Sequence, residues 1–198
     1  CLRLVGSEMC IRDSLKIYFV TDNLNNQKLK FRLELRDFKG KLFKSWEKDF
    51  NSNPNNSSLI HNVDLMSLKN DDDFFYDKYM HATVSIGEIN ITEKVGFLTS
   101  FKNLNLDSPI FEFKVNAVDS FFEINFESKN LIKNLFVKSS SDYNFSDNYF
   151  DLLPNETKTI KIKRDNFHSV AKFKESLSFI SLYAVSYTHL TLPTIVGV

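Results

Sequence analysis

Histidine and clustered aspartate are the residues of this chain that could bind a metal ion, and neither has the spacing that such a site requires. His61, His81 and His168 are far apart and form no HxH or HxxxH pair. The run NDDD at 70–73 lacks the alternating carboxylates, the glycine and the distal glutamate of a calcium loop. We therefore expect no metal site and no cofactor, with the histidines exposed or at the core edge and the aspartates in a solvated loop.

The motifs of nucleophilic and phosphate-binding sites are also missing from the sequence. Its serines form no G-x-S-x-G elbow, and no glycine-rich stretch could cradle a phosphate. Glu112, Glu123 and Glu127 are on the polar faces of predicted strands, where carboxylates are ordinary. We therefore predict that the chain contains no catalytic residue.

Aromatic side chains are the remaining candidates for a binding site. Trp46, Tyr143 and the cluster FFYDKY at 74–79 could stack on sugar rings, which would make the chain a carbohydrate binder. The alternative, which we favour, is that these rings pack in a core or between domains, as is usual in a chain with 20 Phe. The best candidates for a contact with sugar or with another domain are Phe74, Phe75, Tyr76 and Tyr79.

The stretch SDNYFDLLPNETKTIKI at 146–162 concentrates bulky residues where a solvated loop would have few. It contains no nucleophile, base or glycine cradle. In a sandwich, a connection that crosses between the sheets must cover the open end of the core. We therefore predict a structural plug, with the backbone fixed by proline and Asn155 in a turn that needs positive φ. The plug residues are Tyr149, Phe150, Leu152, Leu153 and Pro154.

The elements that position these residues are predicted to be β-strands, because period-two alternation dominates the chain. Apolar and polar side chains alternate in KFRLELRD at 30–37, and the pattern recurs at 110–117, 121–128 and 159–163. Such alternation is typical of antiparallel strands packed in a sandwich. A helical period occurs only at 168–177. The predicted fold class is all-β, with two consecutive immunoglobulin-like antiparallel β-sandwiches.

A domain junction is predicted just before Pro109, which opens the cleanest alternating strand after the polar pair Asp107 and Ser108. The first sandwich is then expected over residues 15–106 and the second over residues 107–184.

The two ends differ from the rest of the chain in composition. Residues 1–14 and 185–198 contain no Phe, Asn or Lys, although these types are abundant between them. Strings such as SEMCIRDS resemble translated adapter sequence of the kind found at the ends of assembled metagenomic reads. We therefore expect both flanks to be non-native; a genuine N-terminal strand and C-terminal tail are the alternative. Cys1 and Cys10 are in the first flank, so no disulfide or cysteine-based metal site is expected in residues 15–184.

Charge and hydropathy argue against two classes of partner. The formal net charge is +0, with Lys and Arg interspersed among Asp and Glu rather than gathered in a basic stripe. This distribution argues against binding to nucleic acid. No apolar run approaches the roughly 18 residues of a membrane-spanning helix, so no membrane association is expected.

Several stretches of the sequence resemble the motifs of a known enzyme family. FSDNYFDLLPNETKTIKI resembles the signature of the last immunoglobulin-like domain of β-mannosidases in glycoside hydrolase family 2, with Asn155 in place of the usual glycine. The stretches FFEINFESKNLIKNLFV and FKESLSFISLY resemble other strands of that domain. LKIYFVTDNLNNQKLKFRLELRDFKGKLFKSWEKDF and EKVGFLTSFKNLNLDSPIFEFKV resemble the domain before it. The resemblance covers nearly all of residues 15–184.

The resemblance implies a parent enzyme whose chemistry lies elsewhere. Family members are retaining exo-glycosidases that remove terminal β-mannose with two glutamates on a (β/α)₈ barrel. Retaining hydrolysis needs two carboxyl groups about 5 Å apart, and no position of this chain matches the family's catalytic motif. The implied partners are the catalytic barrel of the parent chain, the parent's oligosaccharide substrate and a second copy in a homodimer.

Three hypotheses remain open from the sequence. The first is a non-catalytic C-terminal region that supports the barrel of a β-mannosidase. The second is a stand-alone carbohydrate-binding or adhesion module, and the third is the tail of a related exo-β-glycosidase such as an exo-glucosaminidase. The compartment, periplasm or cytoplasm of a bacterium, is left open.

Overall fold

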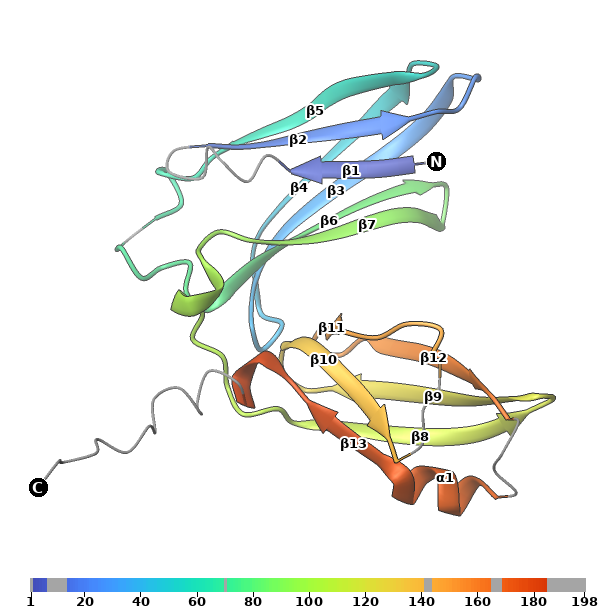
Figure 1. The fold of residues 1–198 in the computed structure, drawn as a ribbon. Coiled ribbons are helices and arrows are strands. Elements are labelled where there is room, and N and C mark those ends of the chain that lie inside the picture. The colour runs from blue at the N-terminus through green and yellow to red at the C-terminus, as the bar shows by residue number, and fades with distance from the viewer. Residues whose placement is uncertain (1, 7–13, 70, 141–143, 165–168, 185–198) are drawn as a thin grey trace, which may run out of the picture. The chain divides into compact units, whose positions relative to one another are not determined.

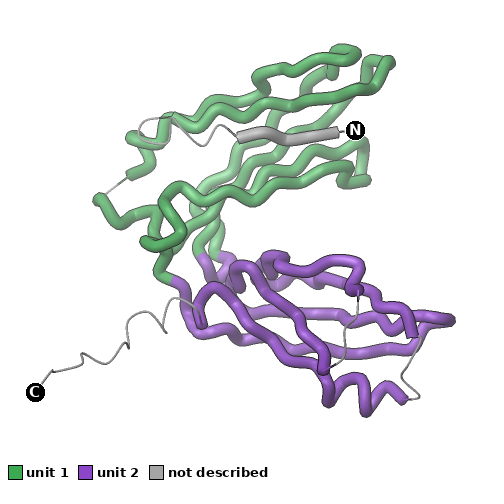
Figure 2. The backbone as a smooth tube through the Cα atoms, in the orientation of Figure 1, with its two compact units in different colours: residues 1–37, 41–105 green, residues 38–40, 106–198 purple. Residues whose placement is uncertain are grey.

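The computed structural model describes the backbone of residues 2–6 and the whole of residues 14–69, 71–140, 144–164 and 169–184. Nearly all regular elements in these ranges are antiparallel strands, which confirms the predicted all-β fold with immunoglobulin-like sandwiches (Figure 1). The chain divides into two compact units (Figure 2). The first comprises Cys1–Asp37 and Lys41–Asn105, and the second comprises Phe38–Gly40 and Leu106–Val198. Within the described ranges, no helix is long and apolar enough to cross a membrane.

The first unit is a sandwich of a three-stranded and a four-stranded sheet. The smaller sheet has the order β1 (Leu2–Gly6), β2 (Ser14–Thr21), β5 (Asn56–Asp64). The larger has the order β4 (Leu42–Ser52), β3 (Gln27–Asp37), β6 (Lys78–Ile86), β7 (Ile89–Phe97). A short 3-10 helix, η2 (Phe101–Asn103), follows β7.

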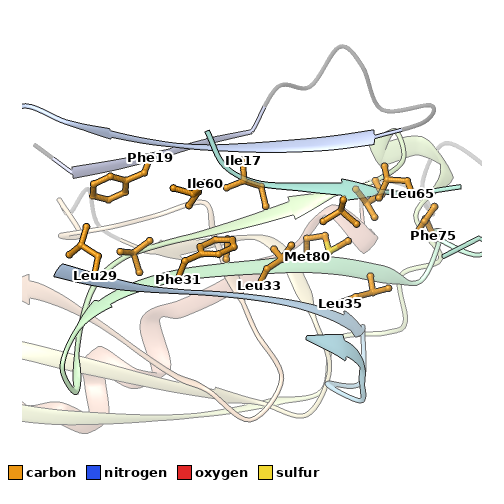
Figure 3. Close-up of a cluster of buried hydrophobic side chains, with 14 residues drawn as sticks. Ile17, Phe19, Leu29, Phe31, Leu33, Leu35, Ile60, Leu65, Phe75 and Met80 are labelled. Atoms are coloured by element: carbon orange, nitrogen blue, oxygen red, sulfur yellow. The ribbon is translucent and has the colours of Figure 1, made fainter. Parts of the chain in front are cut away.

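The core of the first unit follows from the alternation in its strands. On β3, Leu29, Phe31, Leu33 and Leu35 are each no more than 2% exposed. They point toward side chains of the other sheet, such as Phe19 (Figure 3). The charged residues between them lie on the opposite face of β3, as the pattern predicted.

Strand β1 comes from the N-terminal flank. It pairs with β2 over its whole length, from Leu2 opposite Thr21 to Gly6 opposite Ile17. The ladder is made by backbone groups, so any extended chain can form it, whatever the origin of its sequence.

The second unit is a sandwich of two three-stranded sheets. One has the order β12 (Thr157–Lys163), β9 (Phe121–Ser128), β8 (Phe111–Val118). The other has the order β11 (Phe150–Leu152), β10 (Ile132–Ser139), β13 (Leu177–Ile180). The helix expected near 168–177 is α1 (Val170–Ser176), and the Ser169 side chain accepts a hydrogen bond from the Lys172 amide at its start.

Phenylalanines dominate the core of the second unit. Phe122 and Phe126 on β9 are both 0% exposed. Phe173 of α1 stacks on Phe122 with ring centroids 4.7 Å apart, so the helix completes the core by contributing one large ring.

Candidate functional site

The turn from Ser146 to Asn155, here called the signature turn, is held in place by its polar side chains. The Asn148 amide pairs with Val137 of β10 as a strand residue would. Its oxygen accepts from the Val137 amide at 2.8 Å, and its nitrogen donates to the Val137 carbonyl at 2.8 Å. The pairing of β10 with β11 ends at Leu135 opposite Phe150, and the Asn148 side chain then satisfies the N–H and C=O of Val137.

Tyr149 lies outside the core that we expected it to cover. Its side chain is 64% exposed, and its ring stacks on Phe136 with centroids 4.6 Å apart and an interplanar angle of 16°. The physical reason is the backbone, because Tyr149 has a φ of +58°. This left-handed conformation is unusual for a bulky residue, and it turns the tyrosine away from the open end of the core that we expected it to cover.

The other predicted plug residues are buried in the second unit. Phe150 is 7% exposed and lies 5.6 Å from Phe126, measured between ring centroids. Leu152 and Leu153 are 1% and 7% exposed, and Pro154 is buried as well. Phe150 and Leu152 belong to the hydrophobic core cluster of this unit. We retain the proposal that this segment closes the core, now without the tyrosine.

Asn155 adopts the positive φ that its position in the motif predicted. Its φ is +62°, and its amide donates to the Ser128 carbonyl at 2.8 Å. Gly40, in the part of the second unit that precedes residue 106, also has a positive φ of +86°. A Cβ at Gly40 would lie 3.0 Å from the Cβ of Pro154, so both the conformation and the space favour glycine there.

Asp151 and Lys133 form a partly buried ion pair beside the signature turn. The Lys133 ammonium lies 2.9 Å from Asp151, and the side chains are 10% and 22% exposed. The same carboxylate oxygen accepts from the Asn134 amide at 2.9 Å. Asn134 has a φ of +51° at an irregularity in β10, so the Asp151 carboxylate also holds this left-handed residue in place. The sequence analysis did not single out either residue. The available signal was the motif SDNYFD, which ends at Asp151 and places polar residues beside buried ones.

The aromatic cluster at 74–79 is largely packed within the first unit. Phe75 and Tyr79 are 8% and 2% exposed, while Phe74 and Tyr76 are half-buried. The buried ammonium of Lys78 lies over the Phe74 ring, 4.3 Å from its centroid. Phe75 and Tyr79 are thus too buried to stack on a sugar. The contact with sugar or with another domain stays a prediction, and it would fall to the half-buried Phe74 and Tyr76.

Lys78 explains much of this packing. It also lies over Phe43, 4.8 Å from the ring centroid, and bonds to Asp77 at 2.7 Å. A buried cation between two aromatic rings and next to a carboxylate is stabilised by all three groups.

Trp46 is half-buried at the edge between β4 and β5, where it lies against His61 with ring centroids 6.0 Å apart. Burial, reinforced by the positive charge of Lys48, lowers the pKa of His61. A histidine kept neutral in this way belongs to the core edge, one of the two positions expected for the histidines from the sequence. Tyr143 and His168 lie outside the described residues.

A charged cluster covers the outer face of the larger sheet in the first unit. Glu34 is only 7% exposed because two arginines lie against it. The contacts are 2.6 Å from Arg32 and 2.8 Å from Arg36. Burial alone would raise the pKa of Glu34. The hydrogen bond from Arg36 and the positive charges of Arg36, Arg32 and His81 together outweigh burial, so the pKa is lowered.

No feature of this cluster resembles a hydrolytic site. A general acid for glycoside hydrolysis needs a raised pKa, whereas the pKa of Glu34 is lowered. Asp71 and Asp72 of the NDDD run line a shallow surface depression together with Met66 and Lys69. There the hydrogen bond from Lys69 lowers the pKa of Asp72. Across the described ranges, no three His, Cys, Asp or Glu side chains are grouped so that they could hold a metal ion.

In comparisons with known proteins, two consecutive segments of the chain each match a known domain family. Residues 13–103 match the Mannosidase Ig/CBM-like domain, and residues 106–185 match Ig_mannosidase, an Ig-fold domain. No curated protein matches the chain.

Solved structures of glycosidases share the fold. The β-D-mannosidase of Dictyoglomus thermophilum matches with a TM-score of 0.72 and 16% identity, over 91% of this chain and 21% of that one. The exo-chitosanase of Amycolatopsis orientalis matches with a TM-score of 0.56 and 13% identity, over 91% of this chain and 25% of that one. The chain therefore spans about a quarter or less of the length of these enzymes. It belongs to the mannosidase-type immunoglobulin domain families, as a Mannosidase Ig/CBM-like domain followed by an Ig-fold domain.

Proposed function

We propose that this chain is the non-catalytic C-terminal region of a β-mannosidase-like glycoside hydrolase of family 2. The parent enzyme hydrolyses terminal, non-reducing β-D-mannose residues, and the two sandwiches pack against and support its (β/α)₈ barrel. The observation that carries the proposal is the order of the two mannosidase-type domains along residues 13–103 and 106–185. The likeness to the Dictyoglomus β-D-mannosidase extends over 91% of the chain, which agrees with that order.

The pairing of carboxylates with cations in the described residues favours a structural, non-catalytic role. A retaining glycosidase needs a protonated acid and a carboxylate nucleophile about 5 Å apart in a site that encloses the sugar. In the part of the chain that the structure describes, the buried Glu34 is instead paired with Arg32 and Arg36, and the partly buried Asp151 is paired with Lys133. The lowered pKa of Glu34 keeps that carboxyl group ionised, which suits a structural ion pair and not a proton donor.

A second candidate keeps the architecture and changes the sugar. The likeness to the exo-chitosanase of Amycolatopsis orientalis, with a TM-score of 0.56, favours an exo-glucosaminidase-type parent as the runner-up. The higher TM-score of 0.72 to the β-D-mannosidase favours the first candidate. The two flanks, residues 1–14 and 185–198, are proposed to be non-native, and the family matches over 13–103 and 106–185 leave out nearly all of both.

The experiment for a non-catalytic role is an activity assay of the 198-residue chain. We expect no hydrolysis of 4-nitrophenyl β-D-mannoside above the uncatalysed rate at any enzyme concentration. Turnover that scales with protein concentration, and that survives a second chromatographic step, would contradict the proposal. An unrelated purified β-mannosidase serves as the positive control.

A further inference from the structure

An exposed apolar strip lies on the outer face of the sheet β11–β10–β13 in the second unit. It consists of Tyr149, Phe136 and Ile180, and we call it the tyrosine strip. Phe136 is directly opposite Ile180 in the ladder between β10 and β13, and Tyr149 stacks on Phe136. Tyr149 and Ile180 are 64% and 45% exposed. One face of the tyrosine ring is covered by Phe136.

The signature turn holds the tyrosine in this position at a cost to the backbone. Tyr149 has a φ of +58°, where glycine is favoured and bulky residues are rare. The Asn148 side chain bonds on both sides of Val137, and the Phe150 ring just after the tyrosine lies in the core. An exposed ring held by such a backbone adds little to the core. Strained positions of this kind are concentrated at functional sites.

The area of the strip decides between a protein partner and a small ligand. With roughly 200 Å² for each large side chain, Tyr149 and Ile180 together expose on the order of 200 Å². A stable protein interface covers about 800 Å² on each partner, so the strip is about a quarter of what is needed. An area of this size fits one face of a sugar ring.

Charged groups at the border of the strip also favour a ligand that carries hydroxyl groups. The exposed Lys138 is two residues beyond Phe136 on the same face of β10. Asp147, whose side chain is 44% exposed, lies two residues before Tyr149 in the signature turn and pairs at 2.6 Å with Lys158 of β12, a strand of the other sheet. The centres of protein interfaces are depleted in charged residues. Sugar hydroxyls, in contrast, can accept from lysine and donate to aspartate.

We propose that the tyrosine strip binds a neutral β-linked pyranose chain, with Tyr149 stacked on the C–H face of one sugar unit. A flat strip suits an extended chain whose rings present flat C–H faces, as β-1,4-linked hexoses do. The site lies in the Ig-fold domain, and its binding of sugar can be tested without the activity proposed for the parent enzyme.

The test is affinity electrophoresis of the 198-residue chain in native gels that contain galactomannan, xylan or hydroxyethyl cellulose. The unaltered chain is expected to be retarded in at least one gel. Tyr149→Gly, which suits the backbone and removes the ring, should weaken the binding at least tenfold, while Tyr149→Phe should retain most of it. Phe121→Ala is the matched control, because Phe121 is a 40% exposed ring on β9 of the other sheet.

The outcomes are decisive because the glycine variant should fold. Its urea midpoint is expected to equal or exceed that of the unaltered chain, since glycine relieves the positive φ. Retardation of Tyr149→Gly equal to that of the unaltered chain would overturn the proposal. Absence of retardation in all three gels, or an equal loss in Phe121→Ala, would overturn it as well.

Discussion

Replacing Phe150 by alanine is expected to destabilise the second unit by about 3–4 kcal/mol without affecting the first. The ring is 7% exposed and lies against Phe126, in the cluster that also contains Leu152. The Lys158 ammonium covers its outer side, 5.4 Å from the ring centroid. The substitution therefore removes a large buried ring and its contacts at the edge of the core.

The magnitude follows from the buried area. A ring of roughly 150–200 Å² at about 25 cal/mol per Å² corresponds to about 4–5 kcal/mol. The alanine retains its Cβ, and an unfolded chain already hides part of this surface, which reduces the figure to about 3–4 kcal/mol. This agrees with the usual cost of about 3–5 kcal/mol for truncating a buried phenylalanine.

The assay can separate the two units because the chain has 1 Trp, and Trp46 lies in the first unit. Urea unfolding followed by tryptophan fluorescence reports the first unit, whereas far-ultraviolet circular dichroism reports both. Phe150→Ala should lower the midpoint of a dichroism component and leave the fluorescence transition in place. Phe121→Ala, at a 40% exposed ring of the same unit, should cost under about 1 kcal/mol. A cost below about 1 kcal/mol for Phe150→Ala, or an equal shift of both transitions, would refute the reasoning.

Three further substitutions test the signature turn and the charged cluster by the same unfolding assay. Asn155→Gly should stabilise the second unit by about 0.5–1 kcal/mol, because Asn155 has a φ of +62°; a lower midpoint would contradict this. Asp151→Ala should cost about 2–3 kcal/mol by leaving the Lys133 ammonium, 10% exposed, without its carboxylate. Asp151→Ala combined with Lys133→Met should recover part of that loss, and no recovery would count against the ion pair. Glu34 has a lowered pKa, so its contribution is full above about pH 4.5 and is lost as the pH falls further through the folded-state pKa. Glu34→Gln should therefore flatten the decline of stability below pH 4.5, and an unchanged decline would show that other groups cause it.

Much of the architecture could be predicted because burial alternates along the strands. Phe31, Leu33 and Leu35 are nearly inaccessible to water, as their period indicated. Asn155 was predictable in a different way, because asparagine tolerates positive φ and here stands in a turn.

Tyr149 could not be placed from its residue type. Tyrosine gives no local signal for a left-handed backbone, and the conformation depends on the Asn148 side chain bonding to Val137 of another strand. A prediction from bulk alone, which assigns every large side chain of this connection to the core, therefore places the tyrosine wrongly.

The cluster at 74–79 shows a second limit. Whether Phe74 is free to contact a sugar depends on Phe43, more than 30 positions earlier in the sequence, since both rings pack around the Lys78 ammonium. Packing between distant segments decides exposure, and neither composition nor periodicity contains that information.

The most direct test of the central claim is a long sequencing read across the gene, upstream of codon 15 and downstream of codon 184. We predict that the reading frame extends upstream into a (β/α)₈ barrel with two glutamates placed for retaining hydrolysis, and that it stops soon after Tyr183 without the sequence of either flank. A frame that begins with a signal peptide just before Leu15, and that contains no barrel, would contradict the assignment to a glycoside hydrolase and leave sugar binding as the function of the chain.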